Sequence, residues 1–249
     1  MIALQHTEAL LMATAVALYL YDSSMLLHAN EAVLIPAARQ AWRAAFGSDR
    51  TTFRGTELLL PNPFLPARPL FRLGWDFERP GHATGAEWTA ARGVLSQFAA
   101  PVWCLSILMF VALPLVLFGR FGDLAVLAGF LLIYLNLSWL VVLLWLRRVA
   151  LGLPDRACLL VALDLLVCPP FAVNLIRRLA LRFKVEEDFI HAAQRLLGRE
   201  DWEAARAHVL SRLDDEISFE PQESARMATL LRRRAALEAE GGTCPAPKS

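Results

Sequence analysis

Two carboxylates occupy positions where a membrane would make them costly or reactive. Asp164 lies inside the apolar run Ala157–Ile176, and Asp22 closely follows the apolar stretch Leu10–Leu20. An ionised carboxylate in hydrocarbon costs at least about 2.5 kcal/mol, so such a group is protonated, paired with an Arg or open to water. Groups of this kind also mark proton and ion pathways. Asp22 and Asp164 are therefore the first candidates for chemistry.

Further polar side chains follow Asp22. If the first apolar helix continues, steps of three or four residues place Tyr21, Ser24, His28 and Glu31 on one face. We interpret this face as the polar end of a buried packing surface, at the lipid headgroups. The functional alternative is an intramembrane polar site that handles a proton, an ion or a headgroup. Its candidate residues are Tyr21, Asp22, His28, Asn30, Glu31, Asn136 and Asp164.

Each candidate also has a structural interpretation. Asp164 is expected to form an ion pair with Arg156, Arg147 or Arg148 near the inner membrane surface. Asn136 lies in the middle of an apolar run and is expected to hydrogen-bond to a neighbouring helix, which contributes about 1 kcal/mol.

The sequence contains no recognisable catalytic motif, such as GxSxG, HExxH, a P-loop or a dinucleotide fingerprint. No two histidines share a helix face at ligand spacing, and no pair of the four cysteines has CxxC spacing. The net charge of +1 gives no general attraction to nucleic acid. We expect no catalytic residue, cofactor, metal or nucleic-acid partner.

The elements that must position the polar residues centre on a helical hairpin over residues 97–148. Its segments Phe98–Phe118 and Leu124–Leu146 contain no charged residue, and each has about the 20 residues that cross a bilayer. The chain is 56% hydrophobic, above the roughly 45–50% of soluble domains. Pro114 removes a backbone hydrogen bond, so we expect a kink near Phe110.

Two further segments bear on the number of spans. The N-terminal segment, residues 1–30, is predicted to contain a first membrane helix, which covers residues 4–28. In residues 149–183, Pro169-Pro170 follows only about a dozen apolar residues, which is typical of a re-entrant segment. Arginines that flank membrane helices tend to lie on the cytoplasmic side. Three spans with a re-entrant segment place nearly all of them there, whereas four spans do not. We therefore favour three spans with the N-terminus outside, and keep a fourth span as the alternative.

The remaining segments predict water-facing structure. Residues 31–96 predict a small β-rich loop domain with three short strands, and helix over residues 37–46 is the alternative. Trp75, Phe77 and Trp88 suit the membrane interface. Residues 184–240 predict a soluble cap of three amphipathic helices, and residues 241–249 predict a disordered tail.

The sequence thus predicts a mainly α integral membrane protein with a cytoplasmic helical cap. We expect a non-catalytic accessory or scaffold subunit. The alternatives are an oligomeric transporter or channel subunit using Asp164 and Asp22, and a membrane-embedded enzyme with a site at Asp22, His28 and Glu31. The expected partners are the bilayer and a membrane protein or second copy, bound through small residues: Ala9, Ala13, Ala17, Ala125 and Gly129.

Overall fold

The computed structural model describes residues 2–37, 41–53, 55–76, 86–119, 121–183, 187–221 and 224–240. Its contacts divide the chain into two compact units built from interleaved segments. Unit 1 comprises Met1–Met25, Leu60–Pro69 and Ala86–Lys184, and unit 2 comprises Leu26–Leu59, Leu70–Gly85 and Val185–Ser249. Phe77 and the predicted tail 241–249 lie outside the described residues.

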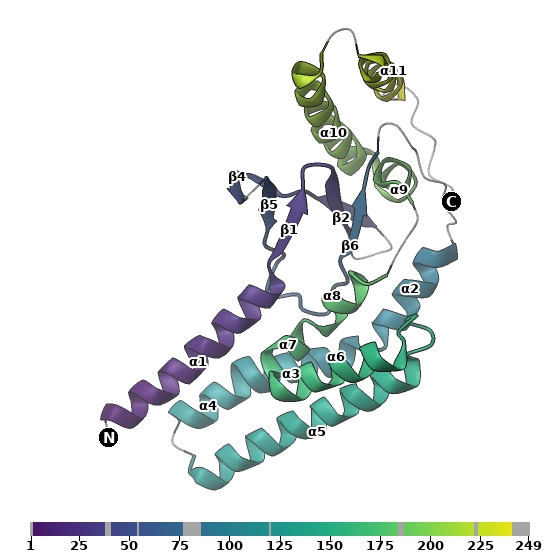
Figure 1. The fold of residues 1–249 in the computed structure, drawn as a ribbon. Helices are drawn as coiled ribbons and strands as arrows, with labels where there is room; N and C mark the ends of the chain where they lie inside the picture. The colour runs from purple at the N-terminus through teal and green to yellow at the C-terminus, as the bar shows by residue number, and fades with distance from the viewer. Residues whose placement is uncertain are drawn as a thin grey trace. The chain divides into compact units, whose positions relative to one another are not determined.

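Unit 1 is helical (Figure 1). Its elements are α1 (Ile2–Ser23), α2 (Ala86–Ser96), α3 (Ala99–Ile107), the π-helical turn η2 (Leu108–Ala112), α4 (Leu113–Phe118), α5 (Asp123–Arg147), α6 (Asp155–Val167), α7 (Pro169–Val173) and α8 (Leu175–Ala180).

The predicted hairpin is present. Ala99–Phe118, which joins α3, η2 and α4, and Asp123–Arg147 are both long and apolar enough to cross a membrane. They run side by side in Figure 1, and α5 contacts α3 and α4. Along α5 a single stripe is buried, formed by Ile133, Leu137, Leu140 and Leu144. The apolar side chains on its other faces are largely exposed within the chain.

The first helix of the hairpin is irregular at the predicted place. Pro114 has no amide hydrogen to donate to the carbonyl of Phe110, and the π-helical turn Leu108–Ala112 lies immediately before it. A wide turn of this kind accommodates the missing bond without ending the helix.

The first helix ends earlier than predicted. The amide of Ser24 donates to Leu20 O at 3.1 Å, and its hydroxyl donates to Tyr21 O at 2.7 Å. The following residues form strand β1 (Met25–His28), in which burial alternates from one residue to the next. The predicted helix face that joined Tyr21 to His28 and Glu31 is therefore wrong, because the period changes from 3.6 to 2 within it.

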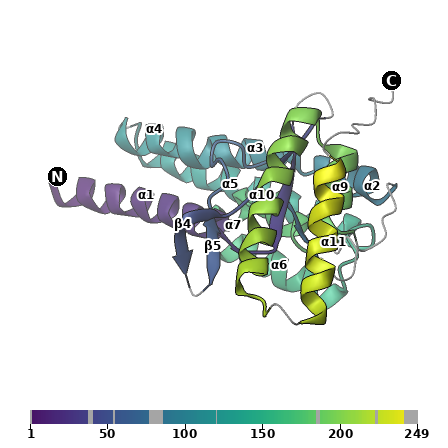
Figure 2. The same ribbon diagram turned by 90° about the horizontal axis from the view of Figure 1, so that it is seen from above.

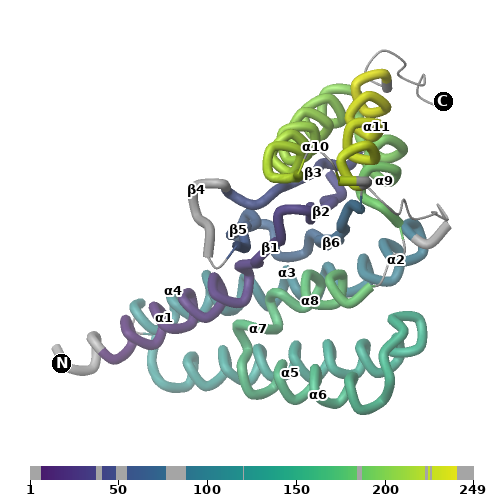
Figure 3. Tube along the Cα trace, turned by 45° about the horizontal axis from the view of Figure 1, so that its top comes forward, coloured from purple at the N-terminus to yellow at the C-terminus, as the bar shows by residue number. Residues whose placement is uncertain are grey.

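The segment with the two prolines folds back inside unit 1. Helix α6 has 13 residues, so it is only about 20 Å long, shorter than the roughly 30 Å of a bilayer core. Cys168 leaves the helical conformation at φ −129° and ψ 83°, and Pro169 starts α7. Figure 3 shows the chain turning through α7 into α8. Helix α6 packs on α5, and α7 packs on α1 and α3.

Unit 2 contains β structure in the predicted region, but the described part of residues 31–96 forms five strands where three were predicted. Its strands are β1, β2 (Glu31–Pro36), β3 (Trp42–Ala45), β4 (Ser48–Phe53), β5 (Thr56–Leu59) and β6 (Phe71–Gly74). They form three-stranded sheets of order β1-β5-β4 and β3-β2-β6. Strand β2 is antiparallel to both neighbours, with Val33 opposite Ala45 and Arg72. The alternative of a helix over residues 37–46 is wrong, because β3 lies there.

The three predicted C-terminal helices are confirmed as α9 (Phe189–Leu196), α10 (Arg199–Phe219) and α11 (Ala225–Glu240). Helix α9 packs against β2 and α10 against β3, while α10 and α11 lie side by side (Figure 2). Trp75 is only 3% exposed and packs with Phe46 and Phe189. Trp88 of α2 is 2% exposed. The predicted interfacial position of both tryptophans is wrong, because each fills a protein core.

Two phenylalanines of unit 2 test this core. Phe189 is fully buried, and replacing it with Ala leaves a cavity that should cost about 3–5 kcal/mol. Phe219 is 88% exposed, so Phe219→Ala should change stability by no more than about 0.5 kcal/mol. Limited proteolysis of the full chain in detergent measures the effect. Equal protease resistance of the two variants would contradict the assigned core.

Candidate functional site

One buried guanidinium organises the polar interior of unit 1. Arg177, which is 3% exposed, donates from Nη1 to Ser23 Oγ at 3.0 Å and to Asn174 Oδ1 at 3.2 Å. Its Nη2 donates to the carbonyl oxygens of Asn62 at 2.6 Å and Leu65 at 3.1 Å. We call these residues, together with Tyr19, the Arg177 cluster. All four acceptors are neutral, so they engage both terminal nitrogens of the guanidinium without neutralising its charge, while its buried Nε has no hydrogen-bond partner among the described residues.

The cluster joins three segments that are distant in sequence. Ser23 Oγ donates to Asn174 Oδ1 at 3.0 Å, and Asn174 Nδ2 donates to Tyr19 O at 3.0 Å. The Tyr19 hydroxyl donates to Pro63 O. The end of α1, the proline-rich segment Leu60–Pro69 and the start of α8 are thereby held together. The prolines leave the carbonyls of this segment without strand or helix partners, and Arg177 and Tyr19 supply the donors.

The predicted intramembrane acid Asp164 forms an ion pair, but not with a predicted partner. Its Oδ2 accepts from Arg178 Nη2 at 2.7 Å. Arg148 instead pairs with Asp155 at 2.8 Å. The prediction of Arg147, Arg148 or Arg156 is wrong because it considered residues adjacent to the start of α6. The fold-back after Pro169 brings Arg178, from α8, to Asp164 near the C-terminal end of α6.

Asp22 lies beside this ion pair. Its carboxylate contacts the side chain of Asn174 and is within electrostatic range of Arg178, Asp164 and Arg177. Among the described residues, the buried Asp22 Oδ2 and Arg178 Nη1 have no hydrogen-bond partner. The structure thus brings Asp22 and Asp164 together in unit 1, as the hypothesis of a shared polar site requires. Among the side chains that the structure describes, Asp22 Oδ2 and Arg178 Nη1 are therefore the unpaired buried atoms of this pair of groups, and Arg177 Nε, nearby in sequence, is unpaired as well.

The other predicted site residues lie apart from this pair. His28 and Glu31 belong to strands of unit 2, where Glu31 Oε2 accepts from the His28 amide at 2.7 Å and pairs with Arg72. Asn30 Nδ2 donates to Trp75 O at 3.4 Å. Tyr21 is 76% exposed. The carboxylate of Glu31 is therefore already occupied by structural partners.

Asn136 does not make the predicted bond to a neighbouring helix within the part of the chain that the structure describes. Its Oδ1 is buried and has no hydrogen-bond partner there. The hydroxyl of Ser138 donates to Tyr134 O, within its own helix, at 2.8 Å. The middle of α5 therefore contributes no cross-helix polar contact from these two residues.

Unit 2 has buried ionic groups of its own. Glu57 is 5% exposed and pairs with Arg212, while Glu187 pairs with Arg195 at 2.8 Å. Asp188 precedes α9, accepts from the Asp76 amide at 3.3 Å and lies 3.5 Å from His191. Burial raises the pKa of the Asp188 carboxyl, while the Asp76 amide and His191 oppose this effect.

The sequence interpretation missed the centre of the cluster. Tyr19, Ser23, Asn174 and Arg177 were not among the candidate residues. A signal was available, since Asn174 and Arg177 are polar residues three positions apart in a largely apolar stretch, a spacing that would place them on one side of a helical turn. No group of three or more metal-ligating side chains occurs among the described residues.

Comparisons with protein-family models, curated proteins and solved structures found no match to this chain.

Arg177 offers a direct test of the cluster. Arg177→Met removes all four donated bonds that tie α1, Leu60–Pro69 and Asn174 together. Hydrogen bonds to a charged group contribute about 1.5–3 kcal/mol each, so the variant should lose at least about that much stability. The exposed Arg182 in the same part of the chain is the matched control, and Arg182→Met should have little effect. The thermal midpoint in mild detergent, followed by reaction of the buried Cys158 with a fluorescent thiol reagent, measures the difference.

Asp188 gives a pH-dependent prediction. Its pKa is raised in the folded state, so the folded chain binds more protons than the unfolded chain above about pH 4. The contribution of Asp188 to the free energy of unfolding therefore falls as the pH rises above about 4. Asp188→Asn should gain stability relative to the native chain as the pH rises above about 4, as measured by urea unfolding of the full chain. A difference independent of pH would contradict the raised pKa.

Proposed function

We propose that the protein is a non-catalytic integral membrane protein in which unit 1 is embedded in the bilayer and anchors unit 2 as an accessory or scaffold module. The observation that carries this proposal is the exposed apolar surface of the hairpin. On α5, Leu124, Leu127, Leu131 and Leu135 follow each other at helical spacing and are 81%, 66%, 60% and 58% exposed. Surfaces of this kind on a protein in water mark membrane or partner contacts.

The proposed topology has three spans. These are α1 and the two segments Ala99–Phe118 and Asp123–Arg147, with α6, α7 and α8 as a re-entrant segment. The shortness of α6 and the break at Cys168 support re-entry over a fourth span. In this arrangement Arg120 is the only arginine of the connections on the outer side, which agrees with the positive-inside tendency. Unit 2 is then cytoplasmic.

The arrangement of polar groups supports a scaffold role. In unit 1, both terminal nitrogens of Arg177 donate structural bonds and Asp164 is paired. The alanines at positions 9, 13 and 17, which are expected to contact a partner or a second copy, are all exposed within the chain. In lipid, such a stripe lets a helix of another chain approach closely. Gly129 instead faces its own hairpin. A Cβ atom built at this glycine would lie 3.7 Å from the Leu113 side chain.

An oligomeric transporter or channel subunit is the second candidate. The observation that favours it is the placement of Asp22 and Asp164 around Arg178, with one buried oxygen and one buried nitrogen left unpaired. Three spans are too few to enclose a pathway in one chain, so this function requires association of several copies.

A charged substitution in the hairpin tests whether the chain is embedded in a membrane. Leu135→Arg, in the middle of α5, should cost roughly 2.5–3.5 kcal/mol of insertion and lower the membrane-integrated fraction after alkaline carbonate washing. Phe219→Arg, on an exposed residue of unit 2, should leave that fraction unchanged. A native chain that is monodisperse in buffer without detergent would contradict the proposal.

Purification in mild detergent tests the scaffold role. We expect the chain to be retained in a complex of defined mass, measured by light scattering, with a second protein in stoichiometric amount. A homo-oligomer with uptake activity in vesicles would favour the transporter alternative, and turnover by the purified chain would favour an enzyme.

A further inference from the structure

The two units differ in how the charge of their arginines is balanced. Among the described residues of unit 2, the arginines that pair with a carboxylate are Arg72, Arg195, Arg199, Arg212, Arg226 and Arg234. In the described part of unit 1, only Arg148 and Arg178 form such pairs. The side chains of Arg92, Arg147 and Arg156 make no ion pair or hydrogen bond within the chain. Their charge is therefore balanced from outside the chain.

Two of these unpaired arginines flank the α5–α6 turn, the connection between the end of α5 at Arg147 and the start of α6 at Asp155. The Nε of Arg148 donates to Asp155 Oδ1 at 2.8 Å, which joins the two helix ends. Arg147 and Arg156 are the sequence neighbours of this pair, and both are exposed. Helix α2, which carries Arg92, lies at the same end of unit 1 (Figures 1 and 3).

The α5–α6 turn keeps a net positive charge. Within residues 147–156 the sole acid is Asp155, and Arg148 already pairs with it. Asp123 lies at the other end of α5, roughly 36 Å away at 1.5 Å per residue. Arginine stays protonated at any physiological pH, so the two flanking guanidinium groups are permanent cations.

Exposed apolar side chains lie directly beside these cations. Leu146 and Val149 are three residues apart and are 68% and 80% exposed, so they continue the apolar surface of the hairpin up to the turn. Trp145 is also exposed, and the guanidinium carbon of Arg148 lies 4.4 Å from the centre of its ring. Apolar side chains followed by tryptophan and arginine match the passage from acyl chains to headgroups in a bilayer.

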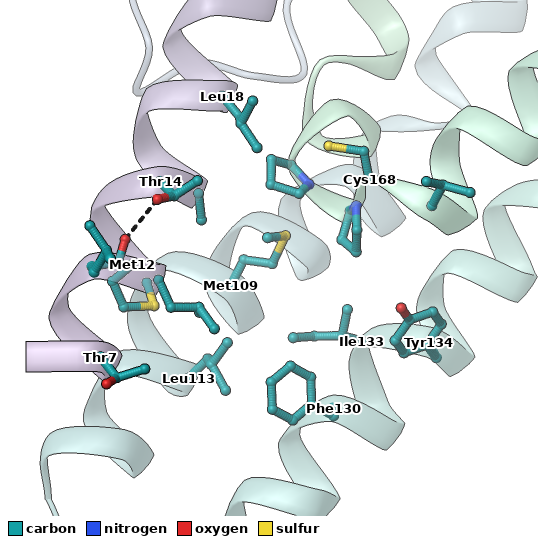
Figure 4. A pocket seen from close by; sticks show the side chains of 16 residues that line it. Thr7, Met12, Thr14, Leu18, Met109, Leu113, Phe130, Ile133, Tyr134 and Cys168 are labelled. Atoms are coloured by element: carbon teal, nitrogen blue, oxygen red, sulfur yellow. Dashed lines mark hydrogen bonds between the residues drawn. The ribbon is translucent and has the colours of Figure 1, made fainter. Parts of the chain in front are cut away.

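The apolar cavity of unit 1 offers no other place for a charged headgroup. This cavity has a volume of about 520 Å³ and lies between α1, the two helices of the hairpin and the turn at the paired prolines (Figure 4). None of the side chains that line it is charged. A phosphate group therefore finds its counter-charge at the α5–α6 turn and not in this cavity.

We propose that the α5–α6 turn binds the headgroup of an anionic phospholipid, such as phosphatidylglycerol. Arg147 and Arg156 are the cations that meet its phosphate, and its acyl chains lie along Leu146 and Val149. This proposal rests on the proposed function, which places the turn at the inner surface of the membrane, where anionic lipids attract arginines. A zwitterionic headgroup is disfavoured, because its ammonium group finds Asp155 already occupied.

Trp145 provides a local measurement of the bound lipid. The full chain is placed in bilayers with equal amounts of phosphatidylglycerol and phosphatidylcholine, and the acyl chains of one lipid at a time carry bromine, which quenches tryptophan fluorescence. The signal of Trp145 is the part that Trp145→Phe removes. Each arginine near an anionic lipid contributes roughly fivefold in affinity, so two predict a preference of at least about tenfold for phosphatidylglycerol. This preference should fall as the salt concentration rises.

Three variants separate the roles of charge and fold. The double variant Arg147→Gln with Arg156→Gln should lose the preference, whereas Arg147→Lys with Arg156→Lys should keep most of it. Arg199→Gln, at an exposed arginine of unit 2, is the control for a change in net charge and should behave as the native chain. The thermal midpoint in detergent should be the same for all of them, because neither Arg147 nor Arg156 has a partner in the chain. An unchanged preference in the Gln double variant would overturn the proposal.

The remaining outcomes separate this site from the anchoring role. Quenching of Trp145 by neither lipid would show that the hairpin is not embedded, and both proposals would fail together. Equal quenching by the two lipids would reject the anionic lipid alone and leave the turn to an acidic protein. Inorganic phosphate, added at millimolar concentration, should not reduce the preference. A loss of preference there would show that the turn binds free phosphate rather than a lipid headgroup.

Discussion

The interior of unit 1 depends on one cation buried among neutral oxygens. Arg177 contacts the end of α1, the proline-rich segment Leu60–Pro69 and Asn174 at the turn into α8. A guanidinium suits this position because its five donors lie in a fixed plane and stay charged at any physiological pH. A lysine would offer fewer donors and a different geometry. The fold-back of α6 through α7 and α8 is tied to the rest of unit 1 at this point, and Asp164 meets Arg178 one residue further on.

Much of the fold could be predicted because it follows from local pattern. The hairpin was evident from two long uncharged segments, and the irregular turn before Pro114 from a missing donor. The helices α9, α10 and α11 were evident from their periodic apolar residues. Composition also indicated β structure after residue 30, although strand β1 begins earlier, at Met25. In each case the deciding information lies within about 20 residues of sequence.

The polar site could be predicted only in part, because its contacts are long-range. Asp22 and Asp164 were suspected from their apolar neighbours, and they do share one region. Their partners could not be inferred, because Arg178 reaches Asp164 only after the chain reverses at Pro169. The predicted interfacial position of Trp75 and Trp88 was wrong for a different reason. A tryptophan near apolar sequence suits a membrane interface and a protein core equally well.

The interleaving of the two units along the chain has a consequence for biosynthesis. The last strand of unit 2 ends at Gly74, but the helix that packs on β2 begins at Phe189, about 115 residues later. At about 5–20 residues per second, a ribosome needs roughly 6–23 s to make that interval. During this time the nascent strands lack the α9 and α10 surfaces that cover them, while the hairpin and the rest of unit 1 are being synthesised. Completion of unit 2 therefore waits for the synthesis of most of unit 1.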